Sequence, residues 1–100
     1  MDNIDLERIT YSLSKVYKSC YMVQAQSQII LDELLELGYD DNDEVFLKHI
    51  SQMDIEELSN IINKFNKSFD IMSEHIQNST QNIVKSKRIL DYKEGERKLN

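Results

Sequence analysis

Two histidines and one cysteine are the side chains of this 100-residue chain best suited to metal binding or nucleophilic chemistry. His49 and His75 lie far apart, and neither has a second ligand at the three- or four-residue spacing of a helical metal site or acid–base pair. Cys20 is the only cysteine, so no intramolecular disulfide forms, and no histidine lies near it in sequence to act as its base. We therefore expect no metal site and no catalytic nucleophile, and we place Cys20 in the core.

The acidic run from Asp40 to Glu44 has the composition of a calcium loop but not its spacing. An EF-hand loop that starts at Asp40 needs glycine at its sixth position and glutamate at its twelfth, where this chain has Val45 and Ser51. The two glycines of the chain lie far apart and form no phosphate-binding loop. We expect no cofactor and no small-molecule substrate, and we expect that the protein is not an enzyme.

The elements that hold these side chains are predicted by two apolar stripes with a 3.5-residue period. Such a period is typical of long helices packed along a narrow seam. The first stripe comprises Leu6, Ile9, Leu13, Val16, Cys20, Val23, Ser27, Ile30, Leu34 and Leu37, and the second comprises Leu58, Ile62, Phe65, Phe69, Met72, Ile76, Ser79, Ile83, Ser86 and Leu90.

Composition and end signals predict a single all-α domain over residues 1–100. The chain has no proline, two glycines and 40% apolar residues, which favours uninterrupted helix. We expect a first helix over about 5–37 that ends at Gly38, a short helix over about 43–52, and a third over about 55–93. Asp54 followed by Glu57 is a capping-box pattern for the start of the third helix.

Two long amphipathic helices joined by a compact connection should form an antiparallel hairpin. With Leu37 beside Ile55, the stripes pair Ser27 with Phe65 and Cys20 with Met72. Apolar residues outside this seam need another partner, so we expect the hairpin to complete a bundle by dimerisation or by binding another helical protein. The predicted partner-binding flank is Tyr11, Tyr21, Met22, Ile71, Val84 and Ile89.

The net charge of −6 is unevenly distributed. Ten acidic residues lie between Asp32 and Glu57 against Lys48 alone, whereas Lys85 to Lys98 holds six basic residues. The acidic region is interpreted either as solvated helix faces and caps or as a docking surface made of Asp40, Asp41, Asp43 and Glu44. The basic residues near the C-terminus are interspersed with acids, so we expect no nucleic-acid binding.

The N-terminal residues are acidic and lack the basic start and apolar run of a cleavable signal peptide. No apolar stretch approaches membrane-spanning length, so no membrane insertion is expected. These features predict a cytoplasmic protein that is exported, if at all, without such a signal.

A helical hairpin of about 100 residues resembles the ESAT/WXG-like substrates and partner proteins of type VII secretion. Tyr92-Lys93-Glu94-Gly95-Glu96 is similar to the Tyr-x-x-x-Asp/Glu export motif that follows the second long helix in that family. The turn here is Leu37-Gly38-Tyr39, in place of the family's Trp-x-Gly. The resemblance implies that the chain is secreted or pairs with a secreted protein, and that Tyr92 and Glu96 form an export signal.

Two further functions are consistent with the same residues. One is a small acidic inhibitor, such as an antitoxin, an immunity protein or a phage anti-defence protein, whose acidic region blocks a basic site on a target enzyme. The other is a structural homodimer. The preferred hypothesis is a non-catalytic adaptor, chaperone or secretion partner that bundles with another helical chain.

Overall fold

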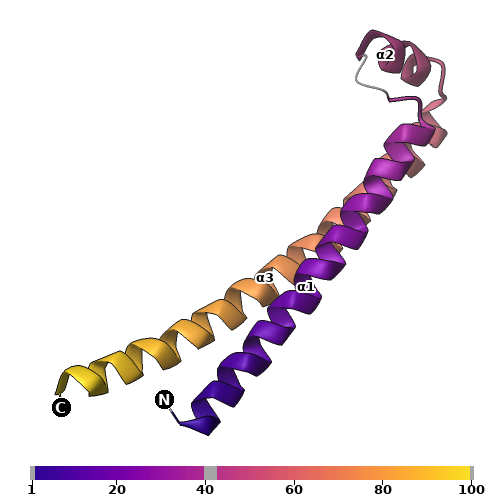
Figure 1. Ribbon diagram of the computed structural model, residues 1–100. Coiled ribbons are helices and arrows are strands. Elements are labelled where there is room, and N and C mark those ends of the chain that lie inside the picture. Colours follow the sequence, from indigo (N-terminus) through magenta and orange to yellow (C-terminus); the bar gives the residue numbers. More distant parts are fainter. Residues whose placement is uncertain (1, 40–42, 100) are drawn as a thin grey trace. The chain divides into compact units, whose positions relative to one another are not determined.

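The computed structural model describes residues 2–39 and 43–99, and these residues form three helices and no strand. Helix α1 spans Asn3–Glu36, α2 spans Asp43–Ser51 and α3 spans Ile55–Leu99 (Figure 1). The all-α fold with two long helices is confirmed. The predicted end of the third helix at residue 93 is wrong, because α3 continues through Gly95.

Aspartate side chains cap the starts of both long helices. The backbone N–H of Asp5 donates to Oδ1 of Asp2 at 2.9 Å, so α1 begins earlier than expected. The N–H of Glu57 donates to Oδ1 of Asp54 at 2.8 Å, as the capping pattern predicted. Each bond satisfies an amide that has no partner within its own helix.

Helix α1 ends at Gly38, whose φ of 92° is in the left-handed region. The N–H of Gly38 donates to the carbonyl of Leu35 at 3.0 Å, and that of Tyr39 donates to the carbonyl of Leu34 at 3.1 Å. This pair of bonds is a Schellman ending. The ring of Tyr39 then meets that of Phe46 edge-on at 5.3 Å between centroids, which attaches α2 to the end of α1.

The chain divides into two compact units. The terminal unit is Met1–Val23 with Ser73–Asn100, and the central unit is Gln24–Met72. In the central unit, Lys64 Nζ lies 2.9 Å from Glu33 Oε2, and Ser27 Oγ donates to Met72 Sδ at 3.3 Å. Met72 therefore takes the place that the sequence assigned to Phe65. The predicted register is wrong by one heptad, because the first turns of α3 extend beyond the end of α1.

The seam contains only part of each predicted stripe. One row of each stripe is buried or half-buried as expected: Ile9, Val16, Val23 and Ile30 in α1 with Leu37 directly after it, and Leu58, Phe65, Met72, Ser79 and Ser86 in α3. In the alternate row Ser27 and Leu34 are half-buried as expected. The prediction is wrong for its exposed members, which are Leu6, Leu13, Cys20, Ile62, Phe69, Ile76, Ile83 and Leu90.

Small polar residues fill the seam in place of that row. Ser12, Ser19, Ser68 and Asn82 are buried, each at the position just before a residue expected in the core. A serine lets two helices approach closely, whereas a leucine at the same point holds them apart. Each long helix is thus rotated so that its apolar face lies partly beside the seam.

Candidate interaction surfaces

The terminal unit carries an exposed apolar surface on one flank of its two helices. We call this surface the neutral face. It comprises Leu6, Leu13 and Cys20 of α1 with Ile76, Ile83 and Leu90 of α3, and its five large apolar side chains are 46% to 54% exposed.

These residues share a flank because of their place relative to the seam. Lys15 and Lys85 each precede a seam residue, and both line the same pocket on one side of the helix pair. Leu13 and Ile83 each follow a seam residue, which on a helix is the other side of the seam. The neutral face therefore lies opposite that pocket.

The neutral face has few charged residues, although 30% of the chain is Asp, Glu, Lys or Arg. The other residues on the same side of each helix are Asn3, Thr10 and Tyr17 in α1 and Ser73, Thr80, Lys87 and Glu94 in α3, of which Lys87 and Glu94 are charged. Glu7 borders this face, because it lines one pocket with Leu6 and Thr10. A surface that is apolar and depleted in charge has the composition of an interface core.

The opposite flank of the terminal unit is a groove bordered by basic side chains. One pocket of about 360 Å³ is lined by Lys15, Lys18, Ser19, Met22, His75, Asn78, Gln81, Asn82 and Lys85. A second of about 320 Å³ is lined by Arg8, Tyr11, Ser12, Lys15, Asn82, Lys85, Arg88 and Ile89. The two share Lys15, Asn82 and Lys85, so they form one groove, which we call the basic groove.

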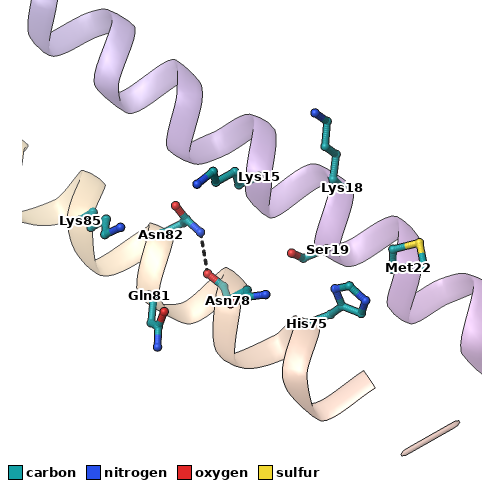
Figure 2. A pocket seen from close by; sticks show the side chains of 9 residues that line it. All are labelled: Lys15, Lys18, Ser19, Met22, His75, Asn78, Gln81, Asn82 and Lys85. Carbon is teal, nitrogen blue, oxygen red and sulfur yellow. Dashed lines mark hydrogen bonds between the residues drawn. The ribbon is translucent and has the colours of Figure 1, made fainter. Parts of the chain in front are cut away.

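No carboxylate lines either pocket of the basic groove. Figure 2 shows Lys15 and Lys85 on the facing sides of α1 and α3, and Lys18 extending away from α3 at the rim. Polar side chains form the floor. Asn82 Nδ2 donates to the backbone carbonyl of Asn78 at 2.8 Å, which fixes the Asn82 amide between the two helices (Figure 2).

An ion cluster lies at the end of the terminal unit nearest the N-terminus. Lys93 Nζ is 3.0 Å from Asp5 Oδ2, 3.6 Å from Asp2 Oδ2 and 3.4 Å from Glu96 Oε2. The interaction of its ammonium group with the Asp5 carboxylate, together with that of Glu96, raises the pKa of Lys93 above its ordinary value. The hydrogen bond from the Asp5 amide lowers the pKa of Asp2.

The residues of the predicted export signal are both exposed. Because α3 remains helical to Leu99, Tyr92 and Glu96 stand one turn apart on the same side of the helix. Lys93 lies beside both, with its Nζ 5.8 Å from the centroid of the Tyr92 ring.

The six residues of the predicted apolar flank lie in several places, and two pairs of them share a pocket. Tyr11, Met22 and Ile89 line the basic groove. Tyr21 lines a pocket with Met22, Tyr17 and Lys18. Val84 is exposed on the terminal unit, and Ile71 is half-buried in the central unit.

Of the predicted acidic docking residues, Asp43 and Glu44 are exposed in the first turn of α2, and Asp40 and Asp41 lie outside the described residues. Cys20, expected in the core, is exposed on the neutral face. Over residues 2–39 and 43–99, no group of three or more His, Cys, Asp and Glu side chains is placed to hold a metal ion. No helix in the same ranges is long and apolar enough to cross a membrane.

Sequence reasoning missed the basic groove because it considered only the basic residues near the C-terminus. Arg8 and Lys15 are seven residues apart, the spacing that returns to the same side of a helix after two turns, and this was the available signal. Comparison of the chain with protein-family models, curated proteins and solved structures finds no match.

Proposed function

We propose that this protein is a non-catalytic interaction module, an adaptor or secretion partner in which α1 and α3 form a helical hairpin. The hairpin binds another helical chain through the neutral face and completes a four-helix bundle with it. The observation that carries this proposal is the exposure of the apolar row that includes Leu13 and Ile83, on a flank with few charged residues.

The small core of the isolated chain supports this proposal. Its accessible surface is 8116 Å², whereas a compact monomer of 11.8 kDa exposes about 5,900 Å². Stable protein interfaces bury about 800 Å² per partner, so the excess is large enough to supply one. A bundle is the packing in which a helix buries two adjacent flanks, one against each neighbour.

The exposed Cys20 provides a direct test of the neutral face, because it is the only cysteine in the chain. A photo-crosslinker attached to Cys20 of the purified protein, incubated with extract of the source cells, should give one dominant crosslinked protein. Mass spectrometry should map the crosslink to a helix of that partner. The purified partner should then form a defined complex with this chain.

The matched control moves the probe to another side of the same unit. In a Cys20→Ser, Val84→Cys variant the probe sits on an exposed position outside the neutral face and should give at least tenfold less of that crosslinked product. Equal yields from the two positions, or no specific product from Cys20, would contradict the proposal.

We further propose that Tyr92 and Glu96 are an export signal for the chain or its bundle. The support is that both side chains are exposed on one turn of α3, where a receptor groove can contact them together. The Tyr92→Ala variant should lose export while keeping its helical content. The control is Tyr21→Ala, at an exposed tyrosine outside the neutral face. If the Tyr92→Ala variant is exported as well as this control, Tyr92 is not part of an export signal.

A further inference from the structure

We propose that the basic groove of one copy binds the acidic central unit of a second copy, which makes the protein a salt-sensitive dimer. This contact is separate from the neutral face. It therefore goes beyond the proposed function and leaves the neutral face available for another partner.

The two units of the chain carry opposite charge. The terminal unit has nine Lys and Arg residues against seven Asp and Glu, a net charge of +2. The central unit has three against eleven, a net charge of −8, and together the units give the −6 of the whole chain. Each copy therefore carries both a basic surface and an acidic one.

Within the residues that the structure describes, the cations of the basic groove form no ion pair, although Arg8 and Arg88 also line a pocket with Asp2 and Asp5. Among the described residues, ion pairs are formed by Lys64 with Glu33 and by Lys93 with its carboxylates. The five groove cations form none: Arg8, Lys15, Lys18, Lys85 and Arg88. Lys15 lies 4.6 Å above the ring of Tyr11, a contact that leaves its charge uncompensated.

Exposed carboxylates of the central unit supply the complementary charge. Glu36 is in the last turn of α1, and Glu56 and Glu57 are in the first turn of α3. All three are exposed, and none forms an ion pair within the part of the chain that the structure describes. The part of the groove around Lys15, Lys18 and Lys85 has no carboxylate in its lining, whereas Arg8 and Arg88 line a neighbouring pocket with Asp2 and Asp5. The lysine-lined part attracts an acidic surface and repels a basic one.

In a reciprocal dimer the grooves of both copies are occupied at once. The groove of the first copy meets the acidic unit of the second, and the groove of the second meets the acidic unit of the first. This arrangement is a closed twofold dimer, the commonest form of symmetric assembly. Because the attraction is between exposed charges, salt should weaken it strongly.

A single-stranded nucleic acid is the other polyanion that fits a basic groove. The chain's net charge of −6 opposes the approach of a long polyanion, and the acidic unit would be repelled by such a ligand. In the dimer, by contrast, each acidic unit is matched to a groove. The observations thus favour the second copy, and the nucleic acid becomes an outcome of the test.

The test is sedimentation equilibrium of the full chain at about 20 mM and about 500 mM NaCl, between which the Debye length falls severalfold. We expect a dimer at low salt whose dissociation constant rises at least tenfold at high salt. A groove variant, Lys15→Glu with Lys85→Glu, should be monomeric at low salt. An acidic-unit variant, Glu36→Lys with Glu57→Lys, should also be monomeric.

Mixing the two variants gives the decisive measurement, because both contacts of the mixed dimer join opposite charges. The mixture should form a heterodimer at least tenfold tighter than either variant alone. Circular dichroism checks that both variants keep their helical content. A monomer at low salt for the unaltered chain, or no heterodimer in the mixture, would overturn the proposal.

Two further measurements separate the alternatives. A Leu13→Gln variant, altered on the neutral face, should still form the low-salt dimer; loss of the dimer here but not in the groove variant would assign self-association to the neutral face. A fluorescent single-stranded oligonucleotide should not bind the unaltered chain. Binding that the groove variant loses, without self-association, would make the groove a nucleic-acid site and overturn the dimer. Failure of the Cys20 crosslinking test leaves all of these results unchanged.

Discussion

At the scale of single residues, the cluster around Lys93 joins the two ends of the chain. Asp2 both caps α1 and lies near Lys93, and Asp5 forms the closest ion pair, with 13% of its side chain exposed. These contacts connect the first turn of α1 to the last part of α3 within the terminal unit. Asp2 and Asp5 therefore have a structural role.

The capping role of Asp2 predicts a dependence on pH. Its pKa in the folded protein lies below the ordinary 3.8, mainly because the Asp5 amide donates to the ionised carboxylate. Its stabilising contribution is therefore complete above pH 3.8 and is lost as the pH falls through the lower, folded pKa. Hydrogen exchange at the Asp5 amide should accelerate over this range.

An Asp2→Asn variant is the control, because asparagine keeps the capping oxygen but does not titrate. Its Asp5 amide should exchange at a rate that shows much less acid dependence once the intrinsic exchange rate is corrected for. An identical acid transition in both proteins would show that another carboxylate is responsible.

At the scale of elements, the two glycines differ in their roles. Gly38 adopts a positive φ that ends α1. Gly95 lies inside α3, where an added Cβ would meet no atom within 4 Å. The sequence predicted a helix end at Gly38, which is confirmed, and an end of the third helix at about residue 93, whereas α3 continues past Gly95 to Leu99.

The glycines therefore give a matched pair of substitutions. Gly38→Ala should destabilise the protein by about 1–2 kcal/mol, since alanine avoids the left-handed conformation. The added Cβ would stand 3.9 Å from His49 Cγ, so the cost is conformational rather than steric. Gly95→Ala should stabilise by up to about 1 kcal/mol through helix propensity. Urea unfolding monitored by circular dichroism measures both, and a stabilising Gly38→Ala would refute the assigned ending.

At the scale of the whole molecule, the core is small, and much apolar surface is left for other contacts. Ile30, Leu37 and Met72 are the buried apolar side chains among the described residues. The seam between the long helices is otherwise filled largely by serine, asparagine and half-buried residues. A chain built this way gains stability when its exposed apolar flank is covered.

Two neighbouring residues of the central unit test which row forms the seam. Met72 is 7% exposed and Phe69 is 56% exposed, although the sequence placed both in the core. Met72→Ala should cost about 2–4 kcal/mol, and Phe69→Ala about 1 kcal/mol or less. Thermal unfolding of dilute protein compares them. A larger loss of stability for Phe69→Ala than for Met72→Ala would show that Phe69, and not Met72, is buried in the seam.

The amino-acid sequence by itself determined the elements of this protein. Helix starts at Asp54 and the end at Gly38 were readable because capping depends on residues within a few positions of each other. The 3.5-residue period also predicted one row of each stripe correctly. Signals of this kind depend on residues that are close in sequence and not on the helix packed against them.

Only the tertiary structure decided how the helices are rotated and where the charges gather. The period cannot distinguish Leu13 from Ser12 as the inward residue, because both are compatible with a seam through Ile9 and Val16. The basic groove likewise forms only when Lys15 of α1 comes to face Lys85 of α3, residues that are distant in the chain. Packing between the helices set both features, and they are the two surfaces from which the proposed interactions of this protein follow.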